Sequence, residues 1–154
     1  MAVKNKYSGK GYQSREHQNS GMSNELLIAL YRDMLRIRRI EEAIESRYHE
    51  DEMKSPIHLV MGHEAVSVGS CSALTEDDLI YCSHRTHGHY LAKGGSLKGM
   101  MSELYCRVNG CSGSRGGSMH LLDKRVGMAG SSAIVAGALP IATGAALSFQ
   151  LKRQ

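Results

Sequence analysis

The chain has 154 residues, the size of one domain or of part of a larger one. Hydrophobic residues make up 42% and charged residues 22%, a globular composition that excludes wholesale disorder and a fibrous repeat. Residues 1–21 hold four basic side chains against one acidic side chain, hence +3 of the net charge of +4, and the rest shows no basic, aromatic-rich face; a nucleic-acid-binding protein is therefore not expected.

The N-terminal segment, residues 1–22, is rich in Gly, Ser, Asn and Gln and is predicted to be a basic flexible leader, with residues 23–154 as the folded part. Its first ten residues contain no apolar signal core, and no segment of the chain approaches the roughly 18–20 apolar residues of a membrane span. We therefore expect a cytoplasmic protein with no membrane partner. The four cysteines form no C-x-x-C pair, which favours reduced and mostly buried thiols.

A long amphipathic helix is predicted over residues 23–50. Ser23 is suited to cap its N-terminus, because a serine hydroxyl accepts a free N–H of the first turn. On the outer face, Arg38 and Glu42 are spaced for an i,i+4 ion pair. Apolar side chains recur at helical spacing, with Glu41 as the one interruption: Leu27, Leu30, Met34, Ile37, Ile44 and Tyr48. Periodicity leaves open whether the helix lies across a neighbouring subunit or packs only on its own domain.

The remaining elements are shorter. A helix of small residues is predicted over 62–74, a buried strand over 79–82, and a helix over 97–107. Residues 109–130 are expected to lack regular structure, and a last helix with Pro140 in its first turn ends at Lys152. This pattern predicts an α/β fold, rich in helices, whose parallel sheet is incomplete because a further strand is expected after the last helix.

The densest group of reactive side chains is Cys82-Ser-His84-Arg-Thr-His87-Gly-His89. A zinc site uses these ligand types, but no second ligand pair follows at zinc-finger spacing, and Arg85 repels a dication. An anion site is the second interpretation, because guanidinium offers a rigid donor fork for phosphate and imidazole exchanges protons near neutral pH. A histidine-rich surface loop without function is the third.

A second group is the Gly-rich stretch Gly113-Ser-Arg-Gly-Gly-Ser-Met-His120. Backbone amides in such a loop can wrap a phosphate, and a flexible connector is an equally good interpretation. The stretch lacks the Gly-Lys-Ser/Thr ending of a P-loop, so ATP binding has little support.

Four motifs follow one another in a fixed order. They are His58-Leu-x-x-Gly62-x-Glu64-Ala65, His84-Arg-x-His-Gly88, Arg115-Gly-Gly-Ser-Met-His120, and Ile134-Val135 with Pro140 downstream. Over about residues 26–154 the pattern resembles the alpha subunit of the thiamine diphosphate-dependent 2-oxo acid dehydrogenases, the decarboxylating first component of pyruvate and acetoin dehydrogenase complexes. The resemblance implies the N-terminal portion of a thiamine diphosphate-binding fold.

The resemblance also implies roles for single residues. In that family the position of Arg85 binds the diphosphate of the cofactor, and His84 stands beside the aminopyrimidine, where many members have tyrosine. His58 and His87 match active-centre histidines that face substrate and diphosphate. His120 belongs to a loop near the entrance of the active centre, and these three histidines are the implied catalytic residues.

The segment around Ala133 and Val135 matches the backbone that contacts the aminopyrimidine. The family usually has glycine at Ala133 and Ala136, so the approach of the backbone to the cofactor is expected to differ there. The magnesium ligands of the family, a Gly-Asp-Gly motif and a later asparagine, are expected beyond Gln154. No residue of this chain is therefore assigned to magnesium.

The resemblance implies a hetero-oligomeric oxidoreductase that decarboxylates a 2-oxo acid with thiamine diphosphate and magnesium. Its implied partners are a complementary alpha-type C-terminal chain, a beta-type subunit and a lipoyl-bearing acyltransferase. One charge-assisted contact from Arg85 contributes about 1.5–3 kcal/mol, whereas micromolar binding needs about 8 kcal/mol, so the chain is not expected to bind the cofactor alone. Two alternatives stay open: a non-catalytic scaffold that uses the 23–50 helix as an interface, and a small metal-binding module built on Cys82, His84, His87 and His89.

Overall fold

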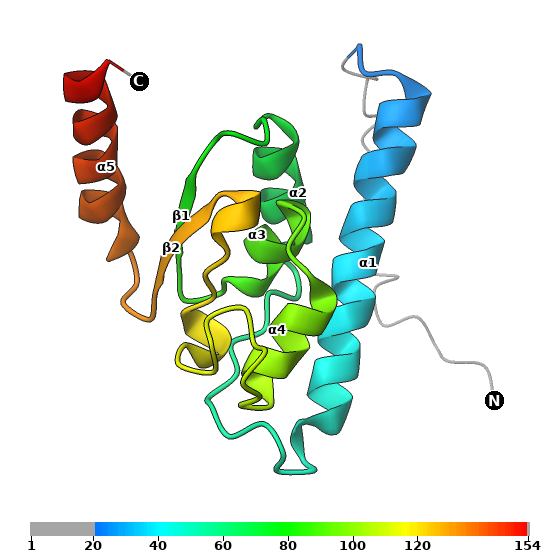
Figure 1. Ribbon diagram of the computed structural model, residues 1–154. Coiled ribbons are helices and arrows are strands. Elements are labelled where there is room, and N and C mark those ends of the chain that lie inside the picture. Colours follow the sequence, from blue (N-terminus) through cyan, green and yellow to red (C-terminus); the bar gives the residue numbers. More distant parts are fainter. Residues whose placement is uncertain (1–20, 154) are drawn as a thin grey trace.

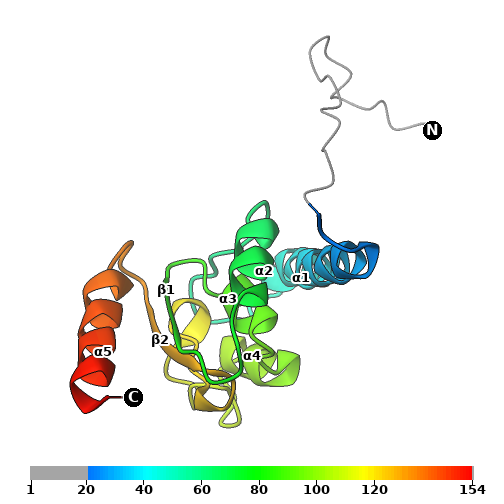
Figure 2. The ribbon, with the colours of Figure 1, turned by 90° about the horizontal axis from the view of Figure 1, so that it is seen from above.

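The structure is a computed structural model that describes residues 21–153, so the predicted leader lies almost wholly outside the described residues. Figures 1 and 2 show the elements in layers: α5 stands on one side, the two strands lie beside it, α2 to α4 come next, and α1 lies on the far side. In chain order the elements are α1 (Asn24–Tyr48), α2 (Glu64–Ser72), β1 (Ile80–Ser83), α3 (His87–Ala92), α4 (Leu97–Leu104), the 3-10 turns η1 (Gly117–Met119) and η2 (Lys124–Val126), β2 (Met128–Ser132) and α5 (Ala138–Lys152).

The predicted long helix is confirmed as α1. The Ser23 hydroxyl caps it by accepting the N–H of Leu26 at 3.2 Å. Ile37 and Ile44 are buried, and so is Glu41, the polar interruption of the apolar stripe. The stripe therefore packs on the core from Leu30 to Ile44, whereas Tyr48 at its end is 45% exposed. The carboxylate inside the stripe has partners of its own, which are described below.

The predicted ion pair between Arg38 and Glu42 is wrong. Arg38 donates instead to both carboxylate oxygens of Glu64, from Nε at 2.6 Å and from Nη2 at 3.0 Å, while Glu42 pairs with Arg39 at 3.0 Å. A two-pronged guanidinium–carboxylate contact is stronger than an exposed i,i+4 pair, so packing of α2 against α1 decides the partner of Arg38.

The shorter predicted helices and the strand are confirmed: α2 and α4 have smaller bounds than predicted, β1 is shifted by one residue, and α5 ends at Lys152 as predicted. Two elements were missed. The first is α3, which takes up part of the histidine cluster. The second is β2, a run of Met-Ala-Gly-Ser-Ser without β-branched or aromatic residues. It forms a strand because it pairs in parallel with β1, in the register Tyr81↔Gly130 and Ser83↔Ser132.

The core lies between α1 and the sheet. Its buried apolar side chains come from α1 to α4, β2 and the loops between them; β1 and η2 add partly buried ones, and α5 contributes only Ala138 to the buried apolar residues. Its fully buried apolar side chains are Ile37, Ile44, Met53, Val60, Val68, Tyr90, Leu91, Met100, Leu104, Leu121 and Met128. The α/β fold with a short parallel sheet is thus confirmed, and within residues 21–153 no helix combines the length and apolar composition needed to cross a bilayer.

Candidate functional site

The carboxyl ends of β1 and β2 meet at one edge of the sheet. His84 and Arg85 directly follow β1, and the segment 133–135 directly follows β2. The N–H of His84 donates to the carbonyl of Ser132 at 2.7 Å, which ties the two strand ends together. In parallel α/β sheets ligands bind outside the carboxyl ends of the strands, so the fold brings predicted site residues from two motifs to the place where a ligand is expected.

His58 reaches the same edge from the loop before α2. Its ring lies 4.2 Å from that of His84 between centroids, edge to face at 66°. Its Nδ1 is buried and has no hydrogen-bond partner among the described residues. A polar atom in that state has been removed from water without compensation, which suits a group that meets a ligand.

His84 adopts a left-handed backbone conformation with φ of 63°, uncommon for a residue other than glycine. Partial burial lowers the pKa of its imidazole, and the neighbouring His58 and Arg85 lower this pKa further. The neutral form of His84 is therefore favoured, and this form can accept a proton from a bound molecule.

Arg85 is exposed, and its Nη1 donates to the carbonyl of Leu59. This contact directs the side chain toward the loop that carries His58. Among the described residues the contact with Leu59 is its one hydrogen bond, and a guanidinium has five N–H donors. Arg85 therefore keeps free N–H donors, and its role in binding an anion stays a prediction.

His87 is placed differently. Its side chain is completely buried, with Nδ1 2.7 Å from Oε1 of Glu41 and Nε2 2.8 Å from Oγ of Ser118. Its two ring nitrogens are thus occupied by protein groups. His120 is exposed, and its Nδ1 lies 3.2 Å from the carbonyl of Ser131 in β2.

The Gly-rich loop does not offer its amides to a phosphate. The N–H groups of Ser112 and Ser114 donate to Oε2 of Glu103 at 2.9 and 2.8 Å, and those of Gly116 and Gly117 donate to Oε1 at 2.7 and 3.2 Å. An internal carboxylate therefore already occupies the amides that the sequence suggested for an external anion. The phosphate-wrapping interpretation of this loop is wrong.

Glu41, Glu103 and Ser118 are the residues of this region that sequence reasoning missed. Glu41 carried a signal, because it is the charged residue in an otherwise apolar stripe. Ser118 lies within the third motif, but nothing local distinguishes its hydroxyl from those of the neighbouring serines. Glu103 sits on a short helix and shows no local signal, since its partners are the four amides of a distant loop.

The metal-binding alternative finds no support in the described part of the chain, where no group of three His, Cys, Asp or Glu side chains is arranged to hold a metal ion. His84 packs against His58, and His87 is engaged by Glu41 and Ser118. Burial, with a smaller effect of Cys71, raises the pKa of the Cys82 thiol to about 12, so this residue stays protonated near neutral pH.

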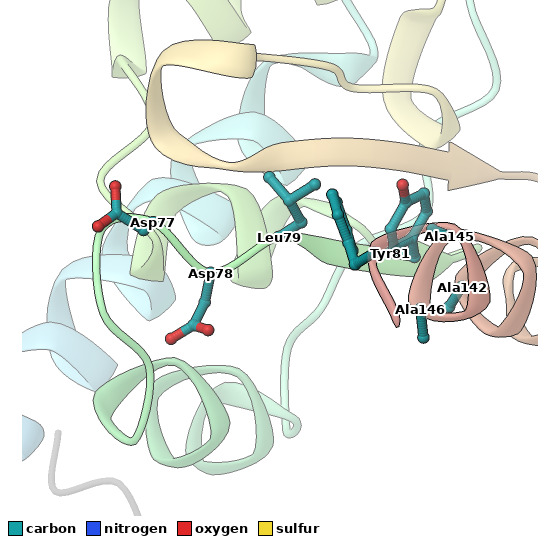
Figure 3. A pocket seen from close by; sticks show the side chains of 8 residues that line it. Asp77, Asp78, Leu79, Tyr81, Ala142, Ala145 and Ala146 are labelled. Atoms are coloured by element: carbon teal, nitrogen blue, oxygen red, sulfur yellow. The ribbon is translucent and has the colours of Figure 1, made fainter. Parts of the chain in front are cut away.

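A groove in the described part of the chain lies away from this edge. It has a volume of about 600 Å³ and separates the start of β1 from α5 (Figure 3). Its lining residues are Asp77, Asp78, Leu79, Tyr81, Ala142, Ala145, Ala146 and Phe149. The groove presents two carboxylates and no cation, so it is unsuited to an anionic ligand, and none of the predicted site residues lines it.

Comparison with known proteins agrees with the motifs. The family model of the dehydrogenase E1 component matches residues 32–154. The chain is 36% identical over 138 residues to the alpha subunit of acetoin:2,6-dichlorophenolindophenol oxidoreductase of Bacillus subtilis, covering 90% of this chain and 41% of that protein. It is 37% identical over 145 residues to the chloroplastic pyruvate dehydrogenase E1 component subunit alpha-3 of Arabidopsis thaliana, covering 94% of this chain and 34% of that protein.

The chain is also 37% identical over 132 residues to the mitochondrial pyruvate dehydrogenase E1 component subunit alpha of Saccharomyces cerevisiae, covering 86% of this chain and 31% of that protein. The chain thus spans about two-fifths or less of the length of these relatives.

Proposed function

Because the chain belongs to the dehydrogenase E1 component family, we propose that it is the N-terminal part of the alpha subunit of a thiamine diphosphate-dependent 2-oxo acid dehydrogenase of the pyruvate or acetoin type. The observation that carries the proposal is the meeting of His58, His84, Arg85 and the segment 133–135 at the carboxyl edge of the sheet. Three motifs far apart in the sequence supply these residues.

The residues at this edge fit such a cofactor. Arg85 has guanidinium donors available for a diphosphate, and a fork of this kind binds phosphate oxygens in pairs. The segment after β2 exposes Ile134 by 71% and Val135 by 74%, so an apolar surface and the backbone beside it are open to a flat ring. The buried and unpartnered Nδ1 of His58 gives the edge a group that lacks a partner until a ligand arrives.

When bound, thiamine diphosphate supplies the carbon chemistry that removes carbon dioxide from a 2-oxo acid. We assign Arg85 to hold the diphosphate and the backbone of Ala133 and Val135 to support the aminopyrimidine. His84, kept neutral by its surroundings, and His58 beside it exchange protons with the substrate oxygen. His120, on the exposed loop next to β2, is assigned to the entrance of the site.

Partner chains are part of the proposal. No magnesium ligand is assigned within this chain, so we propose that a complementary alpha-type segment supplies them and that a beta-type subunit and a lipoyl-bearing acyltransferase complete the reaction. The exposed apolar side chains of α5 support a missing neighbour, because a helix that is apolar on all sides is normally buried; they include Leu139, Ile141, Leu147 and Leu151. The cytoplasmic location stays a prediction, since the relatives include chloroplastic and mitochondrial proteins.

Replacement of Arg85 by alanine tests the cofactor assignment. We expect Arg85→Ala to weaken the binding of thiamine diphosphate by about 10- to 100-fold, because one charge-assisted contact to the diphosphate is lost. The measurement is a calorimetric titration of thiamine diphosphate with magnesium into the full-length protein together with its co-purifying subunits.

Arg32→Ala is the matched control, because Arg32 is an exposed arginine on α1 at which the same charge is removed. Equal affinity in Arg85→Ala and Arg32→Ala would contradict the assignment of Arg85. A titration of the unaltered protein without saturable heat would instead favour the non-catalytic scaffold.

A further inference from the structure

An unbroken chain of buried hydrogen bonds links α1, α3 and η1. Oε1 of Glu41 lies 2.7 Å from Nδ1 of His87, and Nε2 of His87 lies 2.8 Å from Oγ of Ser118. Glu41 and His87 are completely buried, and Ser118 is 1% exposed. None of these three side chains is therefore placed to touch a substrate. Their order of carboxylate, imidazole and hydroxyl is nevertheless that of a proton-accepting triad.

The two ends of this series of hydrogen bonds, Glu41 and Ser118, hold the backbone of the same loop. At one end the N–H of Val60 donates to Oε2 of Glu41 at 2.6 Å, and at the other the N–H of His58 donates to Oγ of Ser118 at 3.1 Å. The residue between them, Leu59, accepts from Arg85 through its carbonyl. Three consecutive residues of this loop are thus fixed by side chains from three different parts of the fold.

One assignment of protons satisfies every donor and acceptor in this hydrogen-bond network. The His58 N–H donates to the Ser118 hydroxyl, which donates to Nε2 of a neutral His87, and the Nδ1–H of that imidazole donates to the Glu41 carboxylate. A doubly protonated His87 would leave the hydroxyl hydrogen of Ser118 without an acceptor. The network is complete without a ligand, so its role lies in holding the loop.

We infer that Glu41, His87 and Ser118 are positioning residues that set the place of His58, and that His87 acts through Ser118 rather than by contact with substrate. The inference rests on the proposed function for the statement that His58 belongs to an active centre. Its geometric part, control of the loop that carries His58, stands without it. Fixing a reacting group in this way matters because a displacement of about 1 Å can lower a rate by about 100-fold.

Ser118→Ala tests the inference in the full-length protein with its co-purifying subunits. Loss of the hydroxyl removes the acceptor of the His58 N–H, so we expect amide hydrogen exchange at His58 to become about 5- to 10-fold faster. With pyruvate as the probe substrate, kcat is expected to fall by about 10- to 100-fold with little change in KM. Ser118→Cys, which places a larger and only weakly hydrogen-bonding thiol at the same position, should show both changes if the alanine variant does not fold.

Ser67→Ala is the matched control. Ser67 is also completely buried, but its hydroxyl has no partner among the described residues, so its removal deletes no hydrogen bond. This variant should leave both the exchange at His58 and the turnover unchanged. Exchange at His58 that is equal in Ser118→Ala and Ser67→Ala would overturn the inference.

A double-mutant cycle separates positioning from general destabilisation. In a His58→Ala background, Ser118→Ala should lower kcat by less than about twofold, because the group that it positions is already absent. Additive losses would overturn the inference. Faster exchange at His58 together with normal turnover in both His58→Ala and Ser118→Ala would support the positioning of the loop and contradict the proposed role of His58.

Discussion

Replacement of Glu103 by glutamine is expected to lower the free energy of unfolding by about 3–5 kcal/mol. The Glu103 carboxylate accepts four backbone N–H groups from residues 112–117 and is 1% exposed. Glutamine keeps the size of the side chain but turns one acceptor into an NH₂ group that faces two of these N–H groups. Buried donors left without acceptors are costly, and they lie in the loop that leads directly into Ser118.

Urea unfolding of Glu103→Gln and of the unaltered chain measures this effect. Glu45→Gln is the control, since Glu45 is an exposed residue of α1 at which the same chemical change should shift the free energy by less than about 0.5 kcal/mol. Amide exchange over residues 112–117 should accelerate in the Glu103 variant alone. If both variants unfold at the same urea concentration, the carboxylate does not hold the loop.

The same carboxylate predicts a loss of stability in acid. Burial raises the pKa of Glu103, but the four N–H donors lower it by more, so the pKa lies below its usual value. A group whose pKa is lower in the folded state stabilises the fold above the pKa of the unfolded chain and loses this contribution as the pH falls through the folded pKa. Stability of the unaltered chain should therefore decline below about pH 4.5, and Glu103→Gln should show a shallower decline over the same range in a pH series of urea curves.

Gly127→Ala is expected to lower the free energy of unfolding by at least about 3 kcal/mol. Gly127 has φ of 71°, a left-handed conformation that costs an L-residue energy, and a Cβ atom there would lie 2.4 Å from the carbonyl oxygen of Asp78. Its own carbonyl accepts the N–H of Ile80 at 2.8 Å, the first contact between β1 and the segment that becomes β2. The chain cannot relieve the overlap without disturbing the pairing that places His84 beside Ser132.

Gly113→Ala separates the two costs in this prediction. Gly113 also has a left-handed backbone, with φ of 66°, but no atom lies within 4 Å of a Cβ placed there. Its replacement should therefore cost only the backbone term, about 1 kcal/mol. Thermal unfolding of the two variants side by side gives the comparison. Equal melting temperatures would show that the overlap with the Asp78 carbonyl oxygen is relieved without loss of stability.

Local signals in the sequence were sufficient to predict most of the helices, the strand β1 and the family, but not α3 or β2. The period of apolar residues and the Ser23 cap located α1, because both signals act between residues three or four apart. Four short motifs in a fixed order identified the dehydrogenase E1 component family and led to His58, His84 and Arg85. The structure places these three residues at one edge of the sheet, and their assigned roles stay predictions.

Contacts between residues far apart in the chain could be identified only from the folded structure. The strand β2 has no intrinsic strand preference and exists through its register with β1. Arg38 binds Glu64 instead of Glu42, and His87 lies between Glu41, 46 residues earlier, and Ser118, 31 residues later. Such contacts depend on how separate elements pack, because the cost of burying a polar group is offset only by a hydrogen-bond partner, and here that partner comes from another element. The spacing of residues along the sequence does not indicate which partner this is.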